Sequence, residues 1–230
     1  MAIKMYDLAG ADSNRRFSPY CWRTKLALAH KQLAVETIPW HFTDKAAIAF
    51  ANSERVPVIV DDGKPVADSW AIANYLEDAY RSKPSLFGGA VGCSLARFYN
   101  AWADTVLHPA MARFLALDIL NHIAKEDQAY FRKSREDRFG MTLEEFCKDR
   151  EARLPAFSQL LEPLRQTLAS QPFLAGQQPL YPDYILFGSF MWARSIGTLR
   201  LLDRADPIDV WRERLLDAFG GMARRAPGYW

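Results

Sequence analysis

Residues 56–69 read VPVIVDDGKPVADS, and this stretch decides the fold. Val56–Val60 has the β-branched composition of a buried strand. Asp62-Gly63 is a hairpin turn signal, so the chain turns back into a second strand. Asp68-Ser69 then offers side chains that cap the start of a helix. The stretch therefore predicts strand, turn, strand and helix in immediate succession.

The residues before this stretch add a strand, a helix and another strand. Residues 2–8 and 33–39 have strand patterns, and Thr43–Ala51 has the pattern of a short helix. Ser18-Pro19 is a strong helix start, with serine at the N-cap and proline at the first helical position. The order β-α-β-α-β-β-α calls for a parallel pair with a right-handed crossover and an antiparallel hairpin at the edge. We therefore expect residues 1–80 to form an α/β domain of thioredoxin-like plan.

The residues after this stretch change in character. Residues 81–89 have linker composition, and residues 90–230 contain no convincing strand pattern, which predicts an all-α helical bundle domain. The segments with helical periodicity are Ser94–Asn121, Leu143–Ala169, Tyr184–Thr198 and Asp209–Ala218. The charged run Arg132–Arg138 mixes signs at helical spacing, and we interpret it as a solvated helix face.

Composition excludes several classes of protein. Of 230 residues, 50% are hydrophobic and 24% are charged, which rules out a disordered chain, and a net charge of +2 gives no indication of a nucleic-acid partner. No apolar run is long enough to span a membrane, and the N-terminus has no signal-peptide pattern. Cys21, Cys93 and Cys147 form no CxxC pair, so we expect reduced thiols and a cytoplasmic setting. The four histidines have no metal-binding spacing, and we expect no metal site.

Two residues at the start of the first helix could carry chemistry. The hydroxyl of Ser18 sits at the positive end of the helix, where it could donate a hydrogen bond to a thiolate, although many serines there only cap the helix. Cys21 lies one turn further on. It could be a reactive thiol of lowered pKa, or a small buried residue, and the second interpretation is favoured.

Two further features lie in the stretch that decides the fold. Pro57 interrupts a strand. A cis bond would turn the backbone of Val56 outward to pair with a peptide, whereas a trans bond would make Pro57 an ordinary edge proline. Asp68-Ser69 could bind the carboxylate and ammonium of a zwitterion, or could only cap a helix. His41 and Arg55 could each reach a ligand carboxylate, or could be solvated surface residues.

In combination these motifs resemble the glutathione S-transferase superfamily over nearly the whole chain. The segments that carry the resemblance are Ser18-Pro19-Tyr20-Cys21-Trp22-Arg23, Arg55-Val56-Pro57-Val58, and Asp68-Ser69 before Ala71-Ile72-Ala73-Asn74-Tyr75-Leu76. The sequences of these segments are most similar to those of the bacterial β-aryl ether-cleaving transferases and their fungal relatives. The resemblance implies a glutathione S-transferase fold, glutathione as cosubstrate, and a homodimer.

The resemblance also implies roles for individual residues. Ser18 would activate the glutathione thiol as the catalytic residue. Val56, before a cis Pro57, would pair with the cysteinyl backbone, Asp68 and Ser69 would hold the γ-glutamyl group, and Arg55, with His41, would reach the glycyl end. A small aromatic electrophile would lie against the helical domain, in a pocket for which we expect Tyr20, Trp102, Thr105, Pro109, Arg113 and Phe114.

The chain departs from the family pattern at one helix start. The family commonly has a Ser/Thr-x-x-Asp capping box, and here Leu180 precedes Asp183 by three residues, so only the acid can cap. Two other functions stay open: a glutathione-dependent thiol-disulfide oxidoreductase that uses Cys21, and a noncatalytic protein that binds hydrophobic ligands or a partner.

Overall fold

The computed structural model describes residues 2–230, and its first part is a mixed four-stranded sheet in the order β2-β1-β3-β4. The strands are β1 (Ile3–Leu8), β2 (Val35–Trp40), β3 (Val58–Asp61) and β4 (Lys64–Ala67). β1 runs parallel to β2 and antiparallel to β3, and β3 and β4 form the antiparallel hairpin. This arrangement confirms the thioredoxin-like plan, including the edge hairpin.

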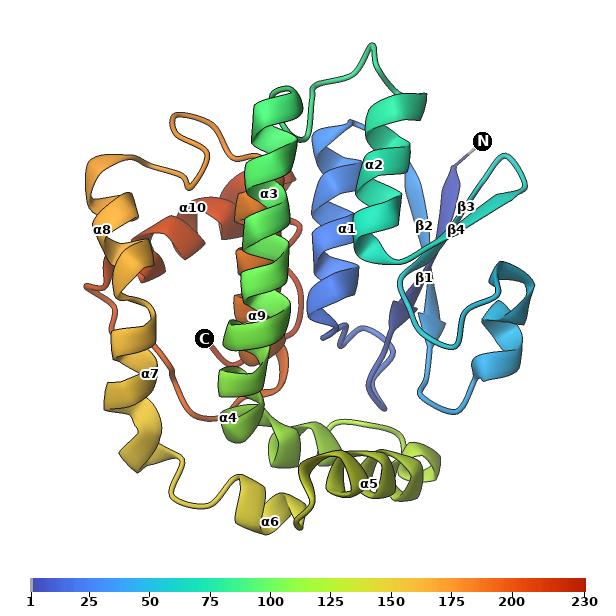
Figure 1. Ribbon diagram of the computed structural model, residues 1–230. Coiled ribbons are helices and arrows are strands. Elements are labelled where there is room, and N and C mark those ends of the chain that lie inside the picture. The colour runs from blue at the N-terminus through green and yellow to red at the C-terminus, as the bar shows by residue number, and fades with distance from the viewer. Residues whose placement is uncertain (1) are drawn as a thin grey trace.

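Helices flank the sheet on both sides (Figure 1). α1 (Pro19–His30) and α2 (Ser69–Ala79) lie between the sheet and the rest of the molecule, and the short segment η1 (Lys45–Ala51) lies beyond the other side. η1 is a 3-10 helix rather than the α-helix predicted over Thr43–Ala51. Its N-cap residue, Asp44, bonds His41 and not the helix, and Asn52 ends it in the left-handed conformation. Without a capped first turn the segment stays short.

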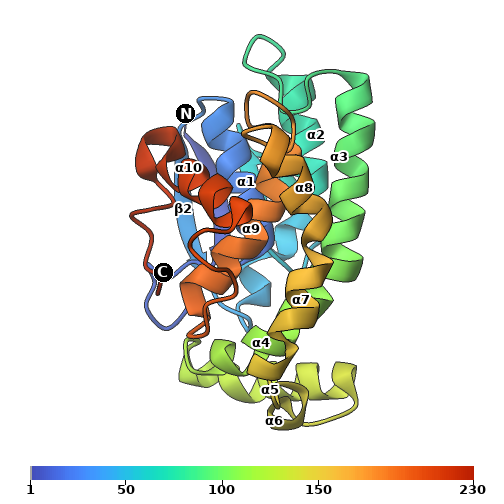
Figure 2. The same cartoon turned by 90° about the vertical axis from the view of Figure 1, so that its left-hand side faces the viewer.

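The second part of the chain is all helical, as predicted. Its helices are α3 (Ala90–Trp102), α4 (His108–Leu120), α5 (Lys125–Phe139), α6 (Leu143–Phe146), α7 (Leu154–Leu160), α8 (Glu162–Ser170), α9 (Tyr181–Ile196) and α10 (Pro207–Gly221). The predicted helix Leu143–Ala169 is instead broken into pieces. α6 ends at Phe146, before Asp149 adopts a left-handed conformation, and Pro155 and Pro163, which lack the N–H that a continuing helix needs, each lie in the first turn of a new helix. α4, α5 and α6 gather at one end of the molecule (Figure 2).

α3 and α4 are joined without a loop by the π-helical segment η2 (Ala103–Leu107). The predicted helix Ser94–Asn121 is therefore one continuous run with a local change of winding. Pro109 follows η2 and has no N–H to donate to the carbonyl four residues earlier, which favours the wider π turn there.

The two parts are held together through α1 and α9, the most buried helix of the second part. Gly188 of α9 lies so close to α1 that a Cβ there would approach the carbonyl oxygen of Pro19 to 2.5 Å, so only glycine fits. Arg23 of α1 is fully buried, and its guanidinium donates to Asp104 and Asn100 at 2.9 Å each. One glycine contact and one buried arginine thus fix the first part against the second.

The start of α9 has the one-sided cap that the sequence predicts. The carboxylate of Asp183 accepts from the backbone N–H of Leu180 at 3.1 Å, while Leu180 has no side-chain acceptor to return the bond. The same carboxylate also accepts from Leu174 N–H and from the indole of Trp211, both at 2.8 Å. Burial raises the pKa of Asp183 to about 6.

Across residues 2–230, none of the helices combines the length and apolar character that crossing a lipid bilayer requires.

Candidate functional site

A cavity of about 720 Å³ lies between the sheet and the far helices. The first part of the chain contributes Phe17, Ser18, Arg55 and Val56 to its wall, and one face each of α4 and α5 closes the opposite side. In Figure 1 these helices lie below the carboxyl end of β2, where α/β proteins commonly bind ligands.

Ser18 is the N-cap of α1 and lines the cavity. Its Oγ accepts from the backbone N–H of Cys21 at 3.2 Å, and the side chain is otherwise nearly buried. Pro19 at the first helical position has no N–H, so the helix turns its positive end toward the cavity with Ser18 in front of it. The hydroxyl proton remains available to a ligand anion.

Cys21 lies behind Ser18, fully buried and away from the cavity. Burial and the nearby charge of Asp7 raise the pKa of its thiol far above its ordinary value. A nucleophilic thiol needs the opposite conditions, exposure and a lowered pKa. The structure gives Cys21 the surroundings of a packing residue.

The bond between Val56 and Pro57 is cis, and Val56 lines the cavity. Among residues 2–230, the backbone N–H and C=O of Val56 have no hydrogen-bond partner. Asp68 lies beside this segment, because its N–H donates to the carbonyl of Pro57 at 3.2 Å. A pair of free peptide groups and an acid therefore adjoin each other at the sheet edge.

Asp68 caps α2. Its Oδ1 accepts from the N–H groups of Trp70 and Ala71 at 3.0 Å each, while Oδ2 has no partner within the described chain. Ser69 is buried, and its carbonyl accepts from Tyr181 Oη at 2.7 Å. Neither Asp68 nor Ser69 lines the cavity, so both lie beyond its rim on the side of Pro57.

Arg55 and His41 are placed differently. Arg55 is exposed and lines the cavity, whereas His41 does not line it and contacts Asp44 at 3.1 Å.

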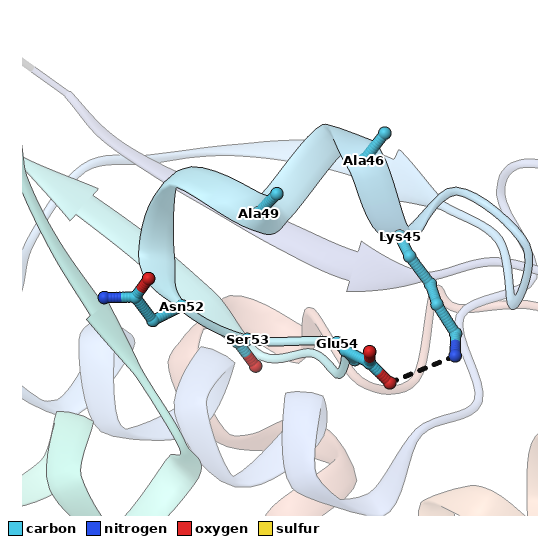
Figure 3. A pocket seen from close by; sticks show the side chains of 6 residues that line it. All are labelled: Lys45, Ala46, Ala49, Asn52, Ser53 and Glu54. Carbon is cyan, nitrogen blue, oxygen red and sulfur yellow. Dashed lines mark hydrogen bonds and ion pairs between the residues drawn. The ribbon is translucent and has the colours of Figure 1, made fainter.

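Figure 3 shows a second hollow, over η1, that is lined by Lys45, Ala46, Ala49, Asn52, Ser53 and Glu54. Glu54 also reaches the main cavity, and its carboxylate pairs with Lys45 at 3.0 Å. The charged groups of this hollow therefore neutralise each other, and its other polar side chains are the neutral Asn52 and Ser53.

The residues expected around an electrophile divide into two groups. Tyr20, Pro109 and Arg113 line the cavity. Trp102 and Thr105 lie outside it, and Phe114 is buried on the other side of α4, where its ring packs against Phe157 at 5.2 Å. The apolar spacing of this helix thus marks core packing as well as the cavity face.

Tyr20 is held by a polar chain that the sequence did not indicate. His108 Nδ1 lies 3.2 Å from Tyr20 Oη, and His108 Nε2 lies 2.8 Å from Ser189 Oγ. Burial lowers the pKa of His108 well below its ordinary value, so the ring is neutral. Burial and the neighbouring Asp104 raise the pKa of Tyr20, which keeps its hydroxyl protonated.

The interpretation of Arg132–Arg138 as a solvated face is wrong for Arg135, which is half-buried, and incomplete for Arg138, which is exposed but also faces the cavity. Arg135 and Arg138 line the cavity, together with Tyr130, Phe131 and Phe139 of the same helix. The spacing 131, 135, 138, 139 is that of one helix face, and it was the signal available in the sequence. It is weak because the aromatic residues flank the charged run instead of lying within it.

Comparisons with known proteins agree with this architecture. Models of the glutathione S-transferase N-terminal and C-terminal domains match residues 17–79 and 94–200. A probable glutathione S-transferase, GSTU6 of Oryza sativa subsp. japonica, is 26% identical over 211 residues, which cover 86% of this chain and 80% of the relative. A glutathione S-transferase of Ceriporiopsis subvermispora, solved in complex with glutathione, superimposes with a TM-score of 0.82 at 21% identity, covering 95% of this chain and 96% of that one. Glutathione transferase GSTFuA2 of Phanerochaete chrysosporium gives a TM-score of 0.73 at 26% identity, covering 96% and 93%. The chain belongs to the glutathione S-transferase superfamily.

Proposed function

We propose that this protein is a glutathione transferase in which Ser18 stabilises the glutathione thiolate. The observation that carries the proposal is the position of Ser18, a hydroxyl at the positive end of α1 on the wall of the cavity. In this proposal residues 1–80 hold glutathione, residues 81–89 link the domains, and residues 90–230 receive the electrophile.

The energy that Ser18 must supply is modest. Lowering a thiol pKa from about 9 to about 7 requires roughly 2.7 kcal/mol. A hydrogen bond to a charged sulfur contributes roughly 1.5–3 kcal/mol, and the helix end adds to it. One hydroxyl at this helix end is therefore sufficient, and the buried, high-pKa Cys21 is not needed as a nucleophile.

The groups along the sheet edge match the groups of glutathione. The unpaired peptide of Val56, beside Pro57, suits the cysteinyl backbone, and Asp68 with Ser69 suits the ammonium and carboxylate of the γ-glutamyl end. Arg55 suits the glycyl carboxylate; His41, which contacts Asp44, is a more distant candidate for the same end. The Ceriporiopsis neighbour was solved in complex with glutathione, which supports glutathione as the ligand of this fold.

The electrophile lies between Tyr20, Pro109 and Arg113 in this proposal. Trp102, Thr105 and Phe114 lie outside the cavity, so we leave them out of the electrophile site. The narrower form of the proposal is the cleavage of aryl ethers, in which the thiolate displaces a phenolate. This narrower form is supported by the sequences of the motifs around Ser18, Val56 and Asp68.

A homodimer is part of the proposal. Val91, Leu95 and Phe98 of α3 are exposed at spacings of four and three residues and form an apolar stripe on one helix face. A second copy of the chain would cover this stripe. Phe98→Glu should therefore shift the mass measured by light scattering from dimer to monomer, and an unchanged mass would exclude this face.

Replacing Ser18 tests the function directly. We expect Ser18→Ala to lower kcat/KM for an activated aryl chloride by roughly a hundredfold, the scale of losing one donor to a developing anion. The glutathione Kd from calorimetry should change by less than about threefold, since one hydrogen bond among several is lost. Ser18→Gly is the second variant, because glycine keeps most of the N-cap stability and also lacks the hydroxyl.

The outcomes separate the competing functions. Turnover that survives in both variants would refute the role of Ser18. Loss of a thiol-disulfide activity in Cys21→Ser, with Ser18→Ala unaffected, would establish an oxidoreductase. Glutathione binding without turnover of an aryl chloride, an aryl ether or a glutathionylated disulfide would establish a noncatalytic binder.

A further inference from the structure

The positive charges of the run Arg132–Arg138 in α5 fall into two classes. On the outer side, Arg132 contacts Glu136 and Glu144 at 2.8 Å each, and Lys133 contacts Asp137 at 2.8 Å. On the cavity side, Arg135 and Arg138 form no ion pair with any residue in 2–230. The outer charges are neutralised by the chain itself, whereas the cavity charges are left for something else.

Arg113 of α4 extends this unpaired set. It also lines the cavity without an ion pair to any described carboxylate, and its guanidinium lies over the ring of Phe146 at 4.6 Å. Arg135 lies over Phe131 at 4.7 Å in the same way. A guanidinium stacked on an aromatic ring is oriented and points its N–H donors outward from the ring. Nη1 of Arg135 donates to Ser134 Oγ at 2.9 Å, and the remaining N–H groups can bind a carboxylate.

The carboxylates of the cavity do not balance these charges. Glu54 is paired with Lys45, and Asp104 is paired with the buried Arg23. Burial and the nearby Arg138 lower the pKa of Arg135 to about 10, so it stays charged at neutral pH. The wall opposite Ser18 is therefore aromatic and electropositive.

We infer that the electrophile is an aromatic compound that carries an anionic group, such as a carboxylate, held by Arg113, Arg135 and Arg138. The inference rests on the proposed function and deepens it. Arg55 serves the glycyl carboxylate of glutathione, and the ammonium and carboxylate of the γ-glutamyl end have Asp68 and Ser69. Three guanidinium groups remain beyond what glutathione uses. The aromatic ring of the electrophile packs against Phe139, because Phe131 is fully buried and Phe146 is stacked on Phe139 and covered by Arg113.

The small residues of α4 provide the room for such a ring. Ala112 and Ala116 lie one turn apart on the cavity face, which Arg113 and the apolar Ile119 share. In the reaction, the glutathione sulfur forms a bond to the ring carbon, and the leaving group departs with the electron pair of the bond that breaks. The thiol proton passes to solvent. The anionic group of the ring takes no part in bond making and serves binding alone.

A matched pair of ligands tests the inference without turnover. The probes are dinitrobenzoate, which is anionic, and dinitrobenzamide, its neutral isostere, and both lack a leaving group. We expect calorimetry on the glutathione-loaded protein to show dinitrobenzoate binding about tenfold more tightly, equivalent to about 1.4 kcal/mol. The preference should shrink as salt is added, because exposed charges are screened.

Variants locate the preference. Arg113→Gln and the double variant Arg135→Gln/Arg138→Gln should each reduce the ratio of the two affinities, and Arg113→Lys should retain part of it. Arg204→Gln is the matched control, since Arg204 is exposed, lies outside the cavity and carries the same charge. It should leave the ratio unchanged.

Three results would overturn the inference. They are equal affinities for the two probes, an equal loss of preference in Arg204→Gln, and displacement of glutathione by dinitrobenzoate, which would assign the arginines to the carboxylates of glutathione. Turnover of chlorodinitrobenzoate and chlorodinitrobenzamide then tests the proposed function separately. A protein that prefers the benzoate probe but conjugates neither chloride keeps its anion site and loses the proposed function.

Discussion

The two walls of the cavity are built by different means. The sheet side presents short groups held by backbone geometry: Ser18 at a helix start and the peptide of Val56, with Asp68 at another helix start beyond the rim. The helical side presents long side chains, Arg113 and Arg135, laid over aromatic rings. Few sequences can form a wall of backbone groups and helix caps, because each group depends on the local fold. A wall of long side chains changes its shape and charge when single residues are substituted. The first wall therefore suits an invariant ligand, and the second suits a particular electrophile.

The buried acid of the helical half gives the largest expected effect. The pKa of about 6 means that the folded protein holds the Asp183 proton up to about pH 6, whereas the ordinary pKa of the free side chain is 3.8. The folded state thus binds more protons between these values, and this residue lowers the free energy of unfolding as pH rises through the window, by about 3 kcal/mol. Denaturant titrations of the wild type and Asp183→Asn at several pH values measure the difference. A difference that stays constant from pH 4 to 6 would contradict the assignment.

The joint between the two halves gives the next effect. Asp104→Ala leaves the buried Arg23 with Asn100 as its one remaining side-chain partner. We expect the free energy of unfolding to fall by roughly 2 kcal/mol, less than for a fully buried pair because Asp104 is partly exposed. The control is Asp78→Ala, which removes an exposed pair with Arg81 and should cost under about 0.5 kcal/mol. Equal losses in both variants would show that the ion pair between Arg23 and Asp104 stabilises the protein no more than an exposed ion pair does.

Substitutions of Asp68 test the sheet side, because this residue caps α2 and, in the proposed function, also binds the γ-glutamyl ammonium. Asp68→Asn should keep the cap on Trp70 and Ala71, since asparagine is a good N-cap, but lose the charge that we propose faces the γ-glutamyl ammonium. We expect the KM for glutathione to rise about tenfold with an unchanged melting temperature. Asp68→Ala should raise the KM and also lower stability by about 1 kcal/mol. If Asp68→Asn leaves the KM unchanged, Asp68 is a cap and nothing more.

The smallest effect belongs to the outer face of α5. Arg132→Gln breaks exposed pairs with Glu136 and Glu144, which should lower the free energy of unfolding by less than about 1 kcal/mol. Because Arg132 lies outside the cavity, the preference for dinitrobenzoate over dinitrobenzamide should stay at the wild-type ratio. A reduced ratio would mean that the general charge of α5, and not its cavity face, attracts the anion.

The difference between the two walls of the cavity also explains which features could be predicted from the sequence. The strands, α1, α2 and the positions of Ser18 and Val56 follow from local signals such as Ser18-Pro19 and Asp62-Gly63, whose structural meaning depends on a few neighbouring residues. Local signals also identified the one-sided cap at Asp183, since the missing partner is three residues away.

The helical wall could not be predicted in this way. Whether Arg135 faces solvent or a cavity depends on which side of α5 meets the rest of the molecule, and charge patterning alone does not record that. Phe114 was placed in the pocket because apolar spacing does not distinguish the two apolar sides of α4. The contact of His108 with Tyr20 and Ser189 joins three distant parts of the chain and has no local signature.

The π segment between α3 and α4 has a consequence for how this helix tolerates a change of length. Each residue of an α-helix turns the chain by about 100°, and η2 holds one extra residue in its turn. Deleting a single residue from Ala103–Leu107 would let this turn return to ordinary α-helical winding, so that His108 and Arg113 would keep nearly the same orientation relative to α3. The widened turn is thus a place where the helix can lose a residue without turning a different face toward the ligand.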